Sequence, residues 1–185
     1  MKILVLSDSH GNIDNMVQAV EKVQPRLILH LGDCWGDAQR LQKRFPDIPL
    51  EQVPGNCDYR SFEEPERLLF IEDKRIFLCH GHTLGVKQSL LRAGYKAEEE
   101  KADLLLFGHT HRPLVDRRGK TLFINPGSIG DYFHPFYAVV TIENGKVDGH
   151  TYPLHERKNH AASAAWFFQR VKKPRRVCPA RGKEA

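Results

Sequence analysis

The chain has 185 residues, 41% of them hydrophobic and 28% charged, a composition that predicts one soluble globular domain. Its longest apolar runs, such as residues 3–6, are too short to cross a membrane, and no signal-peptide pattern precedes Ser7 and Asp8, so we expect a cytoplasmic protein without a membrane partner. Of the net charge of +5, residues 155–185 carry +7 from nine Lys or Arg against two Glu, which leaves −2 on residues 1–154 and argues against a nucleic-acid groove there.

The first part of the chain alternates predicted strands with predicted helices. Residues 2–6 form a short aliphatic run typical of a buried strand, and apolar residues at three- and four-residue spacing predict a helix over 13–23. A second buried strand is expected at 26–31, a helix at 37–45 and a strand at 50–53. Strand, helix and strand in close succession indicate parallel βαβ units.

The second part changes from this alternation to hairpins. Strands are expected at 68–72, 75–79 and 104–107, with a helix at 85–93 and a Lys/Glu-rich connection before the last strand. Strands at 114–117 and 121–125 flank the turn Arg118-Gly119, and strands at 138–143 and 146–152 flank Asn144-Gly145, which is a strong hairpin signal. The chain therefore combines βαβ units with antiparallel strands.

Side chains with metal-binding atoms follow five of the predicted strands. Ligands of open α/β sheets bind at the carboxyl edge of the strands, where residues distant in sequence converge. The Asp-x-His and His-x-His spacings would place two side chains on the same side of an extended segment. Imidazole, carboxylate and amide ligands together suit Mn, Fe, Co, Ni or Zn better than calcium. The candidates are Asp8, His10, Asp33, Asn56, His80, His109 and His111.

Each candidate also has an ordinary structural role open to it. Asp8 could cap the following helix, Asn56 could form a turn, and His80 could be a hydrogen-bonded core histidine. Asp33 could be a loop residue, and the two histidines at 109–111 could be solvated. One shared metal site explains all five strand ends at once, whereas the ordinary roles require five coincidences.

The motifs around these candidates resemble those of the calcineurin-like metallophosphoesterase superfamily, and within it the small bacterial and archaeal phosphodiesterase branch. The matching motifs, in family order, are Asp8-Ser9-His10-Gly11, Gly32-Asp33, Gly55-Asn56-Cys57-Asp58, Cys79-His80-Gly81-His82 and Gly108-His109-Thr110-His111. The resemblance implies an α/β fold, a four-layer αββα sandwich with two mixed β-sheets, in a metallophosphoesterase domain at 1–155. A basic C-terminal tail at 156–185 would follow this domain.

The resemblance also implies two divalent transition-metal ions per chain, with manganese expected first and Fe, Co, Ni or Zn as alternatives. The implied ligands are Asp8, His10 and His111 for the first ion, Asn56, His80 and His109 for the second, and Asp33 for both. Asp33, Asn56 and His80 are thus predicted to be catalytic as parts of the metal site, because a hydroxide bridging the ions would attack phosphorus. Asp58 and His82 are expected to contact the ligands and not the ions, with Asp58 orienting the histidines.

One position departs from the pattern of many relatives. They have a histidine after the Gly-Asn pair, where it is thought to protonate the leaving group, whereas this chain has Cys57. A thiol with the ordinary pKa of about 8.5 is a weak general acid. The small phosphodiesterase branch often carries the Gly-Asn-Cys-Asp form, so activity is still expected, and His82 is the nearest alternative proton donor.

The implied function is a metal-dependent phosphoesterase that hydrolyses small or activated phosphodiesters. Two alternatives stay open: a phosphomonoesterase with the same site, and a scaffold or partner-binding protein of the same fold. A small phosphoester is the expected partner, nucleic acid would bind only weakly through the tail, and a homo-oligomer is left open. Trp35, Tyr132 and Phe133 would either line a substrate pocket or pack in the core, and the tail would either dock Trp166 and Phe168 or be solvated.

Overall fold

The structure is a computed structural model that describes residues 1–59 and 62–155. The predicted basic tail and its aromatic residues lie outside the described residues. In the part of the chain that the structure describes, no helix is both long and apolar enough to cross a membrane.

Two five-stranded sheets form the centre of the fold, and each sheet is mixed. The first has the order β10-β9-β1-β2-β3, in which β1, β2 and β3 are parallel and β9 and β10 are antiparallel to their neighbours. The second has the order β4-β5-β6-β8-β7, with β5, β6 and β8 parallel to one another. The strands of the first sheet are β1 (Lys2–Leu6), β2 (Leu27–His30), β3 (Leu50–Gln52), β9 (Phe136–Glu143) and β10 (Lys146–Pro153). Those of the second sheet are β4 (Glu66–Ile71), β5 (Lys74–Cys79), β6 (Leu104–Leu106), β7 (Leu114–Arg118) and β8 (Thr121–Asn125).

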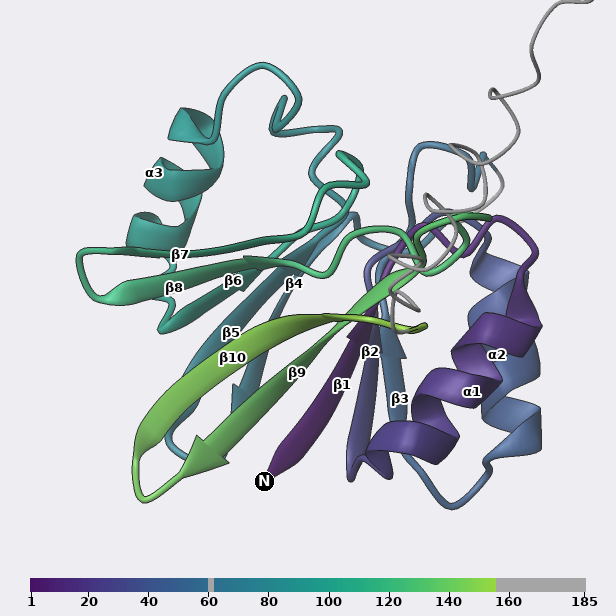
Figure 1. The fold of residues 1–185 in the computed structure, drawn as a ribbon. Coiled ribbons are helices and arrows are strands. Elements are labelled where there is room, and N and C mark those ends of the chain that lie inside the picture. Colours follow the sequence, from purple (N-terminus) through teal and green to yellow (C-terminus); the bar gives the residue numbers. More distant parts are fainter. Residues whose placement is uncertain (60–61, 156–185) are drawn as a thin grey trace, which may run out of the picture. The chain divides into compact units, whose positions relative to one another are not determined.

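Helices cover the outer face of each sheet (Figure 1). Helices α1 (Ile13–Val23) and α2 (Trp35–Arg44) lie on the first sheet, and α3 (Leu91–Glu99) lies on the second. Strand β1 shows how the layers form, because Ile3 and Val5 point into the core between the sheets while Leu4 and Leu6 point toward α1. The predicted four-layer αββα sandwich with two mixed β-sheets is therefore confirmed.

The helix predicted over 85–93 is wrong. Turns occupy residues 82–88, and α3 instead covers the segment predicted to be a Lys/Glu-rich connection. Gly85 has a φ of 65°, which a right-handed helix does not allow. Farther along, Ala93 and Ala97 are four residues apart and both buried, so they give α3 its inner face. The other predicted elements differ from the observed ones by no more than two residues at either end.

The parallel strands of both sheets end at the same place, and the loops that follow them pack closely together. Gly108, after β6, has no room for a side chain, because a Cβ atom there would clash with the Ser7 hydroxyl at the end of β1. His80, after β5, reaches the main-chain oxygen of Leu31 after β2, with Nδ1 at 2.7 Å. The carboxyl edges of the two sheets are thus joined, and the predicted ligands follow these strand ends.

Candidate metal centre

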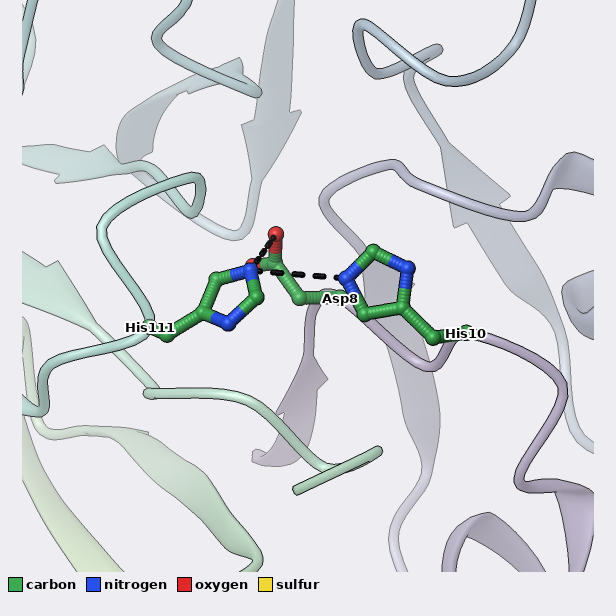
Figure 2. A group of neighbouring side chains, drawn as sticks. All are labelled: Asp8, His10 and His111. Carbon is green, nitrogen blue, oxygen red and sulfur yellow. Dashed lines mark hydrogen bonds and ion pairs between the residues drawn. The ribbon is translucent and has the colours of Figure 1, made fainter. Parts of the chain in front are cut away.

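The structure brings the seven predicted ligands together in two adjacent groups. Asp8 and His10 follow β1, and His109 and His111 follow β6 on the opposite sheet. Figure 2 shows Asp8, His10 and His111 facing one another. His111 Nε2 lies 3.1 Å from Asp8 Oδ1 and 3.4 Å from His10 Nε2. This first group joins side chains that are about one hundred residues apart in the sequence.

The second group forms around His80, whose side chain is fully buried. Its Nε2 atom lies 3.1 Å from Asn56 Oδ1, and its ring centre is 5.0 Å from that of His109. The Asp33 carboxylate stands between the two groups, with Oδ1 3.5 Å from His80 Nε2 and Oδ2 3.9 Å from His10 Nε2. One carboxylate therefore presents an oxygen to each group.

The hydrogen bond to Leu31 determines what His80 offers to this centre. A main-chain oxygen can only accept, so Nδ1 carries the proton and, in the neutral ring, Nε2 keeps a lone pair. That lone pair faces the oxygens of Asn56 and Asp33, and Asp8 Oδ1 is 3.9 Å away. Electron pairs that converge in this way are stabilised by a cation.

Asp8 gives a second sign that a cation fits. Its Oδ2 atom accepts from Ser7 Oγ at 2.5 Å and from the backbone N–H of His109 at 3.1 Å. Its Oδ1 atom is buried and accepts no well-directed hydrogen bond from the described residues. Buried carboxylate oxygens are normally satisfied. The residues of the centre therefore fit divalent metal ions in both donor type and arrangement.

Burial and neighbouring side chains shift the pKa values of several groups in the centre. Burial would raise the pKa of the Asp8 carboxyl, but His111, His80 and Ser7 outweigh burial and lower it. Burial and the neighbouring His80 lower the pKa of His109 to about 4, so this ring is neutral at physiological pH, the form that binds metals. The pKa of His111 is raised by its contact with Asp8.

The backbone that carries the ligands is not extended, which corrects the geometric reason given for the Asp-x-His and His-x-His spacings. Five of the predicted ligands have a left-handed conformation: Asp8 (φ 54°), His10 (φ 45°), Asp33 (φ 61°), His109 (φ 66°) and His111 (φ 59°). Such residues cost about 1–3 kcal/mol each and cluster at functional sites. Neighbouring loops hold the strained turn at Asp8 in place, since Ser128 Oγ donates to its main-chain oxygen at 2.8 Å. Turns, and not alternation along a strand, aim these side chains at the centre.

Asp58 supports the centre in a different way from the one predicted. Its carboxylate contacts no histidine in the described part of the chain. It accepts from the backbone N–H groups of Asp33, Cys34, Trp35 and Gly55, at distances of 2.7–3.1 Å. Asp58 thereby fixes the loop of Asp33 and the start of α2, because the first N–H groups of a helix have no partner within the helix.

The other predicted supporting residue, His82, lies beside the second group. Its ring centre is 5.4 Å from that of His80 and 6.1 Å from that of His109. Its Nδ1 atom is buried and has no hydrogen-bond partner among residues 1–59 and 62–155. Burial, with His80 next, lowers the pKa of His82.

A buried network behind His10 was not predicted. The Asp37 carboxylate, in the first turn of α2, accepts from Ser9 Oγ at 2.8 Å and from the backbone N–H of Gly11 at 2.7 Å. His30 Nε2 lies 3.3 Å from the same Ser9 hydroxyl. These contacts fix the positions of Ser9 and Gly11, which flank His10 in the sequence. An acidic residue in the first turn of the predicted second helix was the only signal in the sequence.

The aromatic residues considered for a substrate pocket are not buried in the core. Trp35 and Cys57 line a groove of about 730 Å³ together with the exposed Tyr59. Tyr132 and Phe133 are exposed and contact each other edge to face, so they do not pack in the core. Desolvation, followed by the Asp33 carboxylate, raises the pKa of the Cys57 thiol to about 11.

Known proteins have sequences and a fold similar to those of this chain. Residues 1–145 match the family model of the calcineurin-like phosphoesterase superfamily domain. The chain is 39% identical over 152 residues to the probable metallophosphoesterase YsnB of Bacillus subtilis, which covers 78% of this chain and 86% of the relative. It is 25% identical over 153 residues to the phosphodiesterase YfcE of Escherichia coli, covering 70% and 79% of the two chains. A crystal structure of a predicted phosphoesterase from Streptococcus pneumoniae is similar with a TM-score of 0.66 at 28% identity, covering 83% and 89%.

Proposed function

Because the chain belongs to the calcineurin-like phosphoesterase superfamily, we propose that it is a metal-dependent hydrolase of small or activated phosphodiesters. Two divalent ions would be held by Asp8, His10 and His111, by Asn56, His80 and His109, and by Asp33 in both sets. The observation that carries the proposal is the Asp33 carboxylate, which presents one oxygen to His10 and the other to His80. When bound, such ions activate water for attack on phosphorus and neutralise the charge of the phosphate.

The chain itself supplies a rigid frame for this chemistry. His80 is held by the Leu31 oxygen with its Nε2 lone pair turned inward, and Asp8 is held by the backbone N–H of His109. Asp58 fixes the loop that carries Asp33. Ligands that are already oriented lose little freedom when an ion binds, and their positions set where a phosphate must lie.

Two considerations support diesters as the substrate class. A phosphodiester carries one negative charge on its oxygens and needs less charge neutralisation than a monoester dianion. Cys57 is a weak acid, so it would protonate a poor leaving group inefficiently. We therefore expect activated diesters to be better substrates than monoesters. The name phosphodiesterase given to YfcE agrees with this choice.

The test is hydrolysis by the full chain after metal removal and reconstitution with Mn²⁺, measured on aryl diesters, alkyl diesters, cyclic nucleotides and aryl monoesters. We expect the highest kcat/KM on aryl diesters. A higher kcat/KM on the matched aryl monoester would assign the chain to the phosphomonoesterases. No hydrolysis of any of these esters at full metal occupancy would favour a binding protein of the same fold.

A further inference from the structure

The cysteine of the Gly-Asn-Cys-Asp motif lies among the ligands and not at a distance from them. One ligand atom from each of His10, Asp33 and Cys57 lies within 4.8 Å of the other two. From these positions we propose that Cys57 is itself a metal ligand, a thiolate that joins His10 and Asp33 on the first ion. This role presupposes the metal centre of the proposed function and adds a ligand to it.

The distances allow this with a small side-chain movement. Metal–nitrogen bonds are about 2.0–2.1 Å and metal–sulfur bonds about 2.3 Å, so two such ligands on one ion are at most about 4.4 Å apart. That limit applies to ligands on opposite sides of the ion; in a tetrahedral site the two atoms are about 3.6 Å apart, so closing a separation of up to 4.8 Å requires a movement of up to about 1 Å. The Cys57 side chain is exposed, so it can rotate without displacing packed atoms.

A second observation indicates that a cation would bind in the first group, which contains Asp8, His10 and His111. The buried Asp8 Oδ1 atom lies 3.1 Å from His111 Nε2 but accepts no well-directed hydrogen bond in the described part of the chain. Asp8 shares with His10 and His111 a cluster of the same kind, in which the ligand atoms lie within 4.8 Å of one another. Because His10 belongs to both clusters, one ion would receive both the Oδ1 atom of Asp8 and the sulfur of Cys57.

Without an ion, burial and the Asp33 carboxylate raise the pKa of the Cys57 thiol to about 11, so the thiolate would form only when an ion binds, because a coordinating thiol is deprotonated. Asn56 Nδ2 donates to Cys57 Sγ at 3.4 Å, and a hydrogen bond donated to the charged form of a group favours that form. The backbone N–H of Cys57 donates to Asp33 Oδ1 at 2.9 Å, which ties the position of Cys57 to that of Asp33. Cys57 thus contacts two proposed ligands, Asn56 through its sulfur and Asp33 through its backbone N–H.

The other two described cysteines have no such place. Cys79 is buried in the core beneath α3, and Cys34, at the residue before α2, belongs to no cluster of metal-binding atoms among the described residues. Cys34 is adjacent to Asp33 in the sequence and only partly buried. It therefore provides a matched control for a cysteine that is near the centre but is not a ligand.

A thiolate ligand would change which metal the centre prefers. Thiolates favour Zn²⁺ and Co²⁺ over Mn²⁺, which prefers oxygen ligands. A thiolate on the ion also has no proton to give to a leaving group. The substitution of histidine by cysteine in this motif would then exchange a proton donor for a metal ligand.

Cobalt reports on the ligand directly, because a thiolate bound to Co²⁺ produces a near-ultraviolet charge-transfer band. The full chain, Cys57→Ser and Cys34→Ser are loaded with Co²⁺, their cobalt content is measured, and their spectra are compared per bound ion. We expect the band in the wild type and in Cys34→Ser, and its loss in Cys57→Ser. Competition titrations should show about a tenfold or greater loss of Zn²⁺ affinity in Cys57→Ser, with a smaller loss of Mn²⁺ affinity.

The wild-type spectrum alone can overturn the proposal, whatever the stability of the variants. A wild-type chain that binds two cobalt ions without the band has no thiolate ligand, and the proposed function then stands without Cys57. Persistence of the band in Cys57→Ser would assign the sulfur to another cysteine and overturn the proposal. A chain that binds no cobalt and hydrolyses no ester would overturn both the proposal and the proposed function.

Discussion

His80 Nδ1 lies 2.7 Å from the main-chain oxygen of Leu31, and this hydrogen bond crosses from one sheet to the other. It connects the loop after β5 with the loop after β2. The same bond that closes the gap between the sheets also leaves the second ring nitrogen of His80 free to bind a metal. One contact therefore both joins the two sheets and orients the ring of a proposed metal ligand.

Removal of metal should abolish hydrolysis, because the ions would supply both the activated water and the neutralising charge. The measurement is kcat on an aryl diester after exhaustive chelation, with residual metal determined by mass spectrometry. Mn²⁺ should restore the rate. Full activity in a sample proven to be metal-free would refute the metal-dependent mechanism.

Substitution of Asp33 should damage both metal sites, whereas substitution of Asn56 should mainly weaken one. The Asp33 carboxylate faces both groups, whereas the Asn56 amide oxygen faces His80 in the second group. We expect Asp33→Asn to lower kcat/KM by more than about 100-fold, beyond the 10- to 100-fold loss typical of residues behind the ligands. Metal content should fall well below two ions per chain in Asp33→Asn and approach one in Asn56→Ala. Two ions per chain and full activity in Asp33→Asn would disprove the bridging role.

A methyl group at position 108 should destabilise the fold. In Gly108→Ala the new Cβ would clash with Ser7 Oγ, and overpacking of this kind costs about 1–3 kcal/mol. Gly36→Ala is the matched control, because Gly36 lies in α2 and a Cβ there meets nothing within 4 Å. The control should be neutral or stabilising, by up to about 1 kcal/mol. Urea unfolding of the metal-free proteins gives both values, and equal stabilities would contradict the close contact between the two sheets.

The buried His30 should make the metal-free protein lose stability in mild acid. Burial lowers its pKa from 6.5 to about 4, so between these values the unfolded chain binds a proton that the folded protein does not. The free energy of unfolding should therefore fall as the pH drops through this window, with a contribution from His30 of about 3 kcal/mol at most.

His30→Gln should remove this part of the pH dependence, whatever its effect on stability at neutral pH. His150→Gln is the control, because the His150 side chain is 62% exposed. The measurement is the free energy of unfolding across the window for the three proteins. An unchanged slope in His30→Gln would mean that His30 is not neutral in the folded protein.

Hydrophobic patterning predicted most of the fold. Strands β1 and β8 match their predicted bounds, because each is a short aliphatic run and the glycine or polar residues beside it mark where the strand ends. The prediction failed at α3, where the turn at Gly85 shifts the helix by about two turns along the chain. A positive φ cannot be read from a glycine alone, since glycine also occurs inside helices, as Gly94 does in α3.

The sequence also indicated which ligands gather, but not how they are held. The convergence of Asp33 and His80 followed from their places at strand ends. The left-handed turns at Asp8 and His10, and the buried bond between Ser9 and Asp37, depend on loops that come together only in the folded protein. Asp58 shows the same limit, because its partners are backbone groups, which carry no signature in a sequence.

The last prediction concerns the proton needed by the leaving group. If Cys57 binds metal as a thiolate, it has no proton to donate, and negative charge must accumulate on the departing oxygen. The rate should then depend steeply on leaving-group pKa and favour phenolic over alkyl esters. General-acid help is typically worth about 10²- to 10⁴-fold, so its absence should be visible in a series of diesters.

The measurement is log kcat/KM against leaving-group pKa for the wild type and His82→Ala, at equal metal occupancy and with chemistry rate-limiting. Equal, steep slopes are expected, because the His82 ring is not in hydrogen-bond contact with the proposed ligands in the described structure. A shallow slope in the wild type that becomes steep in His82→Ala would instead identify His82 as the proton donor.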